Sequence, residues 1–292
     1  MIKLNAVELN TVELSAVTRR YGKTIGIDGL SLTVSEPGIY CLLGRNGAGK
    51  TTLMKLLAGH IPASSGTVSV GGKTVGALAM PENVHFVESA APQFNVRLET
   101  LFGYAQAVNQ NFDMAFALEM AKRFKLDLRK KYKQLSFGMK AMANTLIAMS
   151  SGKEILLLDE PVLGFDPVMR KAFYDMLFES CAQKPKIVIV STHIIDEIEK
   201  VAERLIIIDK GRLALFCGIN EVDEKAYAVT GPAEQVKAAT EGLRVIGETS
   251  AGKFLSRYIY DRRIPESDTY SISALGLQDF FIGLVGDEKG AM

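Results

Sequence analysis

A glycine-rich stretch that ends in lysine and threonine is the segment best suited to chemistry. The residues GRNGAGKTT occupy positions 44–52, after an apolar run at 39–43 and before a segment with helical spacing. In this Walker A pattern the glycines let backbone N–H groups converge on phosphate oxygens, and the following helix adds partial positive charge at its N-terminus. Lys50 is expected to bridge the β- and γ-phosphates, and the Thr51 hydroxyl to ligate Mg²⁺. The predicted nucleotide-binding residues of this stretch are Gly44, Asn46, Gly47, Ala48, Gly49, Lys50, Thr51 and Thr52.

Two adjacent carboxylates supply the second part of a phosphoryl-transfer site. Asp159 and Glu160 follow the apolar residues 155–158, so both are expected at the end of a buried strand. Asp159 is predicted to hold Mg²⁺. Glu160 is predicted to be the general base for the attacking water, a role that contributes on the order of 10²–10⁴-fold in rate. A solvent-facing acidic pair is the alternative, but the Walker A stretch favours catalysis, with Lys50 and Glu160 as catalytic residues.

The segments around these motifs alternate between apolar strands and helices. Such alternation predicts an α/β fold with a mostly parallel sheet covered by helices. Alternating residues from Val12 to Val34 predict an additional antiparallel β subdomain, and helical spacing throughout 95–150 predicts a helical subdomain inserted into the core. The other expected strands are 39–43, 84–87, 155–158, 187–190 and 205–208, and the other expected helices are 51–58, 167–179 and 194–202.

A change in composition at 218–224 predicts two units, 1–217 and 218–292. The second unit contains no catalytic constellation. We expect it to be a small α+β appendage with a regulatory or dimer-contact role. Its segments follow a βαββα order and lie at 226–230, 232–240, 243–246, 254–260 and 277–284.

Composition argues against several classes of protein. The chain has 292 residues, 48% hydrophobic, and a formal charge of +1, which is too balanced to predict a nucleic-acid or anionic-membrane surface by default. Cys41, Cys181 and Cys217 match no metal or redox spacing. We find no signal peptide and no stretch near the roughly 20 apolar residues that cross a bilayer. A role at a membrane would therefore require another chain to span it.

The residues LSFGMK at 135–140 distinguish this chain among phosphate-binding proteins. Ser136 is a plausible helix N-cap, which would leave oriented N–H groups able to bind an anion. Here the chain resembles the ATP-binding-cassette (ABC) proteins, whose signature begins Leu-Ser-x-Gly. In that family the signature of one subunit closes on ATP held by the Walker motifs of the other. The resemblance implies ATP and Mg²⁺ as cofactors and adds Ser136 and Gly138 to the nucleotide site.

Three further family elements occur in order. Tyr21 matches the aromatic residue that stacks on adenine, and His193 matches the switch histidine that contacts the γ-phosphate and is counted as catalytic. Asp166, within LGFDP at 163–167, matches the D-loop and joins the predicted nucleotide-binding residues. Since Pro167 follows it, Asp166 is also an ideal helix N-cap. The resemblance covers Val12 to Leu213.

The Q-loop position departs from the family pattern. A glutamine should follow the strand 84–87, but the chain has Glu88 there, with Gln93 as an alternative. A carboxylate can still hold the metal or its water. Glu88 therefore joins Thr51 and Asp159 in the predicted metal set.

Smaller departures point toward one branch of the family. The signature has Phe137 and Met139 where Gly and Gln are more usual, and the D-loop has Phe165 for Leu. Together with LGLQDFF at 275–281, these variants resemble single-cassette exporters with separate transmembrane subunits, including bacterial antibiotic and antimicrobial-peptide exporters.

The resemblance implies an ATPase subunit that powers a separate transmembrane permease. Two copies, or one copy and a close paralogue, would bind two MgATP between facing Walker and signature motifs. A groove near 88–104 would receive a short cytoplasmic helix of the permease. The expected location is peripheral, on the cytoplasmic face of a bacterial cell membrane, without a nucleic-acid partner.

The sequence leaves three alternative functions open. A soluble cassette protein acting on ribosomes or DNA would be expected to carry a second cassette or long heptad arms, which the sequence lacks. The basic run at 129–133 is more typical of a solvated face than of an RNA site. A nucleotide-dependent clamp or signalling subunit, and an importer ATPase, are the other two.

Overall fold

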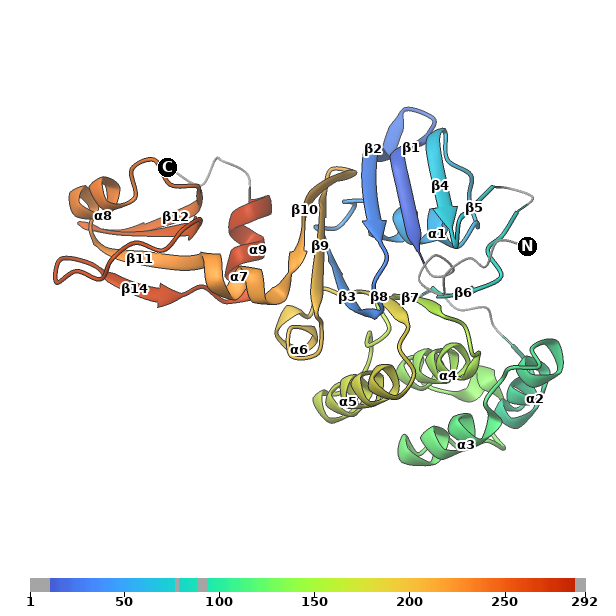
Figure 1. The fold of residues 1–292 in the computed structure, drawn as a ribbon. Coiled ribbons are helices and arrows are strands. Elements are labelled where there is room, and N and C mark those ends of the chain that lie inside the picture. Colours follow the sequence, from blue (N-terminus) through green and yellow to red (C-terminus); the bar gives the residue numbers. More distant parts are fainter. Residues whose placement is uncertain (1–10, 77–78, 89–93, 287–292) are drawn as a thin grey trace.

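The strands of the computed structural model form three sheets within the residues it describes, 11–76, 79–88 and 94–286. Figure 1 shows two of these sheets stacked around α1. A group of helices lies on one side of them, and a C-terminal unit extends from another. The functional motifs lie in the two stacked sheets and the attached helices.

The N-terminal sheet is antiparallel with the order β2-β1-β4-β5. Its strands alternate between buried and exposed side chains, as in Val12, Glu13 and Leu14, because one face covers the core and the other meets solvent. The prediction of antiparallel strands between Val12 and Val34 is confirmed. The bounds are β1 Val12–Tyr21, β2 Thr24–Val34, β4 Ser65–Val70 and β5 Lys73–Thr74.

The central sheet has the order β10-β9-β3-β8-β7-β6, with every neighbouring pair parallel except β9 and β10. Its middle strands are buried along their whole length because both faces are covered, which explains their continuous apolar runs. Parallel strands end at one edge, so the loops after β3, β7 and β8 meet there. The bounds are β3 Gly38–Leu43, β6 Val84–Val87, β7 Ile155–Asp159, β8 Ile187–Ser191, β9 Arg204–Asp209 and β10 Arg212–Gly218.

Helices complete two cores on opposite faces of the central sheet. Leu42 belongs to the core shared with α1 and the N-terminal sheet, whereas Cys41 belongs to the core shared with the helical insert. In Figure 1 the helices α2 to α5 lie together below the central sheet. The bounds are α1 Lys50–Leu57, α2 Leu98–Val108, α3 Met114–Arg123, α4 Phe137–Ser150, α5 Pro167–Gln183 and α6 Ile195–Ile198.

The C-terminal unit has a sheet of its own with the order β12-β13-β11-β14. Helix α8 packs on β11 and β13, and α9 packs on β12 and also on α6 of the cassette. Phe280 of α9 therefore lies in the same core as Ile198 of α6. The bounds are α7 Ile219–Lys225, β11 Ala226–Pro232, α8 Ala233–Ala239, β12 Val245–Ala251, β13 Phe254–Tyr260, β14 Ser271–Ala274 and α9 Leu277–Val285.

The structure differs from the sequence-based prediction in a few elements. Helix α6 is a single turn, not the full 194–202, because the chain must reach β9 where Glu203 N donates to the Ile39 carbonyl at 2.8 Å. The sequence pattern did not predict β4, β5, α7, β10 or β14. Strand β10 ends at Gly218, one residue after the predicted boundary of the first unit.

Candidate nucleotide-binding and catalytic site

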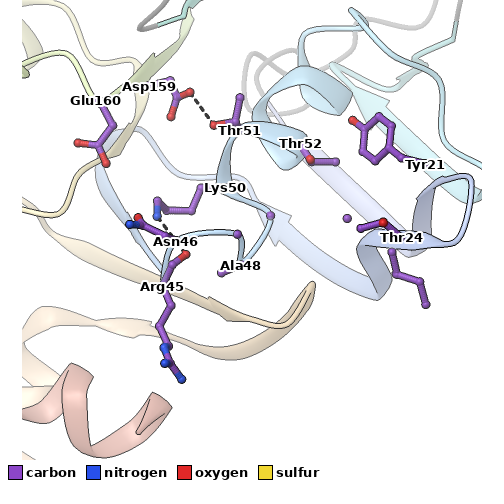
Figure 2. A pocket seen from close by; sticks show the side chains of 14 residues that line it. Tyr21, Thr24, Arg45, Asn46, Ala48, Lys50, Thr51, Thr52, Asp159 and Glu160 are labelled. Atoms are coloured by element: carbon purple, nitrogen blue, oxygen red, sulfur yellow. Dashed lines mark hydrogen bonds between the residues drawn. The ribbon is translucent and has the colours of Figure 1, made fainter.

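The loop between β3 and α1 has the conformation that its glycines allow. Gly49 has φ of 109°, in the left-handed region, and a Cβ there would lie 2.4 Å from the Gly26 carbonyl oxygen. Gly44 is equally restricted, since its Cβ would lie 2.6 Å from the Ile208 carbonyl oxygen. Lys50 Nζ donates to the Gly44 carbonyl at 2.6 Å, so its ammonium lies across the loop. Figure 2 shows this lysine pointing into the space between the loop and the carboxylates.

A cavity of about 410 Å³ lies over this loop. It brings together the loop residues 45–52, the strand-end residues Asp159 and Glu160, and Tyr21 from β1 (Figure 2). The Tyr21 side chain is 44% exposed, and the Arg19 guanidinium carbon lies 4.8 Å from its ring centroid. Backbone amides, an ammonium group and an aromatic ring are the groups that hold phosphates and a base.

Asp159 is the centre of a short hydrogen-bond chain at the end of β7. Its carboxylate accepts from Thr51 Oγ1 at 2.8 Å and from Ser191 Oγ at 2.5 Å, and only 3% of the residue is exposed. Ser191 is the parallel partner of Asp159 on β8. The same Oγ accepts from Glu160 N at 3.1 Å. Ser191 therefore orients both carboxylate residues, a role that the sequence analysis did not assign.

Glu160 and His193, the predicted switch histidine, lie together. His193 Nδ1 is 2.8 Å from Glu160 Oε2. Glu160 has φ of 50°, an uncommon value for a residue with a side chain, and its N–H bonds to the Ser191 carbonyl and hydroxyl hold it there. Such strain is often found where a side chain must point in a fixed direction.

The signature turn packs against the D-loop. Ser136 Oγ accepts from Met139 N at 3.2 Å, which confirms it as the N-cap of α4, and Asp166 Oδ1 accepts from Met169 N at 2.8 Å at the start of α5. A Cβ on Gly138 would lie 2.6 Å from the Gly164 carbonyl oxygen, so the two backbones need a glycine at their contact. None of Ser136, Gly138 and Asp166 lines the cavity over the Walker A loop.

Glu88 lies outside the nucleotide cavity. Its carboxylate forms an ion pair with Lys55 of α1, and the residue lines a separate apolar groove. A contact with Mg²⁺ would require Glu88 to leave Lys55, and that role stays a prediction. The alternative residue, Gln93, lies outside the described residues.

A salt bridge connects the D-loop helix with the switch segment. Arg170 Nε of α5 donates to both carboxylate oxygens of Glu197 on α6 at 2.9 Å, and Arg170 Nη1 donates to the Phe165 carbonyl at 3.1 Å. The guanidinium thus joins the D-loop to the residues that follow His193. Sequence spacing could not have revealed this contact, because it depends on how α5 and α6 pack.

The fold and the site define a nucleotide-binding cassette of the P-loop ATPase class. A family model described as ABC transporter matches residues 27–163. The Nod factor export ATP-binding protein I of Burkholderia lata is 34% identical over 212 residues, covering 69% of this chain and 68% of that protein. The chain therefore belongs to the ABC transporter ATP-binding proteins, and it is an ATP-binding ABC ATPase.

Other comparisons agree with this assignment. The ABC transporter ATP-binding protein YtrB of Bacillus subtilis is 26% identical over 216 residues, covering 73% of this chain and 74% of that protein. A solved dimeric cassette in a post-hydrolysis state with ADP and phosphate has the same fold, with a TM-score of 0.62 at 19% identity. The matched region covers 71% of this chain and 98% of the solved chain. The predicted fold class and ATPase activity are confirmed.

Proposed function

We propose that this ABC ATPase acts as one half of a pair that closes around two ATP molecules and drives export through a separate transmembrane subunit. One observation carries the proposal. Within a single chain, Ser136 and Gly138 do not line the cavity that contains Lys50 and Asp159. A signature that takes part in binding must therefore reach the nucleotide of another subunit.

The surface around the signature is suited to burial. Phe137 is 51% exposed, Leu163 38% and Val168 80%, and they lie next to the signature and the D-loop. Neighbouring apolar side chains left in solvent are typical of an interaction surface. We infer that they face a second copy of this chain or a close paralogue.

ATP would favour the closed pair through contacts that exist only in that state. Lys50 of one copy and the Ser136 turn of the other would hold the same γ-phosphate, and such differential binding is what shifts a conformational population. Loss of the γ-phosphate removes the shared contact, so the pair opens. Glu160, whose N–H bonds to Ser191 and whose carboxylate contacts His193, would accept the proton of the attacking water.

The residues at the Walker A loop fit Mg²⁺. The Thr51 hydroxyl and the Asp159 carboxylate are 2.8 Å apart and supply the hard oxygen ligands that this ion prefers. The described residues contain no group of three acidic, His or Cys side chains able to hold a metal, which agrees with an ion held mainly by phosphates and water. When bound, the ion would neutralise phosphate charge. Thr51 and Asp159 are the residues that would hold it.

The apolar groove beside Glu88 is the proposed docking site of the transmembrane subunit. It has a volume of about 450 Å³ and lies between β6, α2 and α4, with Phe86, Phe94, Leu101, Tyr104 and Ile147 among its walls. A short amphipathic helix is the occupant that such a groove fits. None of the helices in the described part of the chain is long and apolar enough to span a membrane. The peripheral location at the membrane follows from this docking.

Export is favoured over import by the relatives and the motif variants. The Nod factor proteins are export ATP-binding proteins by name, and the departures at Phe137, Met139 and Phe165 resemble those of single-cassette exporters. Peptides or antibiotics are the cargo class that we propose on this resemblance.

The test is nucleotide-dependent pairing of a hydrolysis-deficient variant. We expect Glu160→Gln to form a dimer with ATP and Mg²⁺, seen by light scattering, because ATP is bound but not cleaved. The matched control, Lys50→Ala in the same background, should remain monomeric. A Glu160→Gln protein that is saturated with ATP and still monomeric would rule out pairing of two copies of this chain.

A further inference from the structure

The end of α3 and the segment that follows it, before the signature, carry a concentration of positive charge that the ATPase function does not use. Residues 122–133 contain seven of the 34 basic residues of the chain and one of its 33 acidic residues. The whole chain has a formal charge of only +1, so the remaining residues are net negative. The balanced total charge therefore conceals a strongly basic segment of the helical insert. We call its cations the basic surface, and they are Lys122, Arg123, Lys125, Arg129, Lys130, Lys131 and Lys133.

These cations are exposed and mostly without a counter-charge. Every one of them is exposed to solvent. Arg123 forms an ion pair with Glu179 at 2.8 Å, but the other six have no ion pair among the described residues. The only acid within the segment, Asp127, accepts a hydrogen bond from the Arg129 backbone N–H at 3.0 Å. Exposed cations left unpaired at this density repel one another, which an anionic partner would relieve.

The basic surface is attached to the wall of the groove. Leu98 N donates to the Lys130 carbonyl at 3.0 Å, and Tyr132 N donates to the Val96 carbonyl at 2.8 Å. Phe94, which lines the groove, packs edge-on against Tyr132 with ring centroids 5.4 Å apart. If the groove holds a helix of a membrane subunit, the basic surface beside it is close to the lipid headgroups.

The composition of the basic surface distinguishes between three possible anionic partners: a protein, a single-stranded RNA and a lipid surface. Five of its six unpaired cations are lysines, which act as hydrated point charges, whereas protein interfaces favour arginine because of its bidentate geometry. Single-stranded RNA is bound by exposed aromatic rings between basic residues. The two aromatic residues of segment 122–133 are both buried: Phe124 is 9% exposed, and Tyr132 is 0% exposed and accepts from Asn144 through its hydroxyl. A fluid anionic surface needs neither fixed geometry nor stacking.

We propose that the basic surface binds the anionic lipid headgroups of the membrane and so orients the groove toward the transmembrane subunit. This inference rests on the proposed function, because that function places the groove next to the bilayer. Clusters of four to eight Lys or Arg beside a membrane-embedded partner are suited to such binding, which weakens as salt screens the charges.

The test uses the full chain and lipid vesicles. Vesicles with 30% phosphatidylglycerol in phosphatidylcholine should bind the protein at low salt, and vesicles of phosphatidylcholine alone should not. The variant Lys130→Gln/Lys131→Gln/Lys133→Gln should bind more weakly by about five-fold for each lost charge, hence on the order of 100-fold. A control with the same change in net charge, Lys73→Gln/Lys200→Gln/Lys253→Gln, neutralises exposed lysines elsewhere and should bind like the wild type.

Several results would overturn the inference. Equal weakening by both triple variants would assign the effect to net charge. Equal binding to neutral vesicles, or tighter binding of an unstructured RNA than of anionic vesicles, would also exclude a lipid surface. ATP-dependent pairing of Glu160→Gln in the absence of vesicles tests the proposed function separately. A protein that pairs with ATP but ignores anionic vesicles refutes only the lipid inference.

Discussion

Ser191 offers the sharpest test of how the carboxylates of Asp159 and Glu160 are positioned. Its hydroxyl donates to Asp159 Oδ1 at 2.5 Å and accepts from Glu160 N at 3.1 Å, and the residue is fully buried at the end of β8. Ser191→Ala removes both contacts with the side chain and leaves the hydrogen bond from Glu160 N to the Ser191 carbonyl in place. The change therefore loosens the two carboxylates without removing either.

The expected loss of activity in Ser191→Ala follows from the hydrogen bond between the Ser191 hydroxyl and the Asp159 carboxylate. A hydrogen bond to an ionised group contributes about 1.5–3 kcal/mol. If this energy orients Asp159 and Glu160 for the reaction, kcat should fall roughly 10- to 100-fold. ATP affinity should change by less than about three-fold, because the Walker A backbone and Lys50 hold the phosphates. The Mg²⁺ concentration for half-maximal activity should rise, since Asp159 has lost one of its two orienting partners.

Phosphate release at varied ATP and Mg²⁺, with nucleotide binding measured separately, gives these quantities. Ser150→Ala is the matched control, because Ser150 is also a buried serine but its Oγ has no hydrogen-bond partner among the described residues. Its kcat should equal that of the wild type. A Ser191→Ala enzyme with full kcat and an unchanged Mg²⁺ requirement would show that Ser191 does not position the carboxylates.

Three other outcomes are expected. Gly138→Ala should destabilise the chain by about 1–3 kcal/mol in urea unfolding, because the new Cβ would meet the Gly164 carbonyl oxygen at 2.6 Å. It should also prevent ATP-dependent pairing. Normal pairing of this variant would contradict a role of the signature turn in the pair. Glu88→Gln should lower stability by less than about 1 kcal/mol, since the pair with Lys55 is 29% and 34% exposed. The same variant tests the predicted metal role: a higher Mg²⁺ requirement for ATPase activity would support Glu88 as a metal ligand, and an unchanged requirement would refute that role. Burial, with a smaller contribution from Lys153, lowers the pKa of His85 from 6.5 to about 4. Between these pH values His85 binds a proton in the unfolded chain but not in the folded chain. The free energy of unfolding should therefore fall by roughly 2–3 kcal/mol as the pH drops from 6.5 toward 4. His85→Gln should remove that part of the pH dependence, and an identical loss of stability in the variant would refute the assignment.

The sequence predicted most of the cassette because its signals are local. An apolar run that continues into a glycine-rich loop identifies β3, the phosphate loop and α1 within about 20 residues, and Asp166 before Pro167 marks the start of α5. Local patterns do not give the register between strands. The pairing of Asp159 with Ser191 joins residues on β7 and β8 that are separated by α5, so the role of Ser191 emerges only when the sheet is assembled.

Glu88 illustrates the same limit at a site residue. Its position after β6 is visible in the sequence, but its partner Lys55 lies on α1, and the ion pair depends on how that helix packs. The short α6 has a similar explanation. Helical spacing continues through 194–202, but the need to enter β9 ends the helix after one turn. Tertiary packing overrides local propensity at α6 and selects the partner of Glu88.

The contact between α9 and α6 gives the tail of the chain a mechanical link to hydrolysis. Helix α6 starts two residues after His193 and is joined to the D-loop helix by the Arg170–Glu197 salt bridge. It also packs on α9, whose Leu277 and Phe280 lie in the same core. A movement of α6 during nucleotide turnover would therefore act on the side chains of α9 that share its core. We therefore expect a partner bound to the C-terminal sheet to change the rate of turnover without contacting ATP, which would be the regulatory role predicted for this unit.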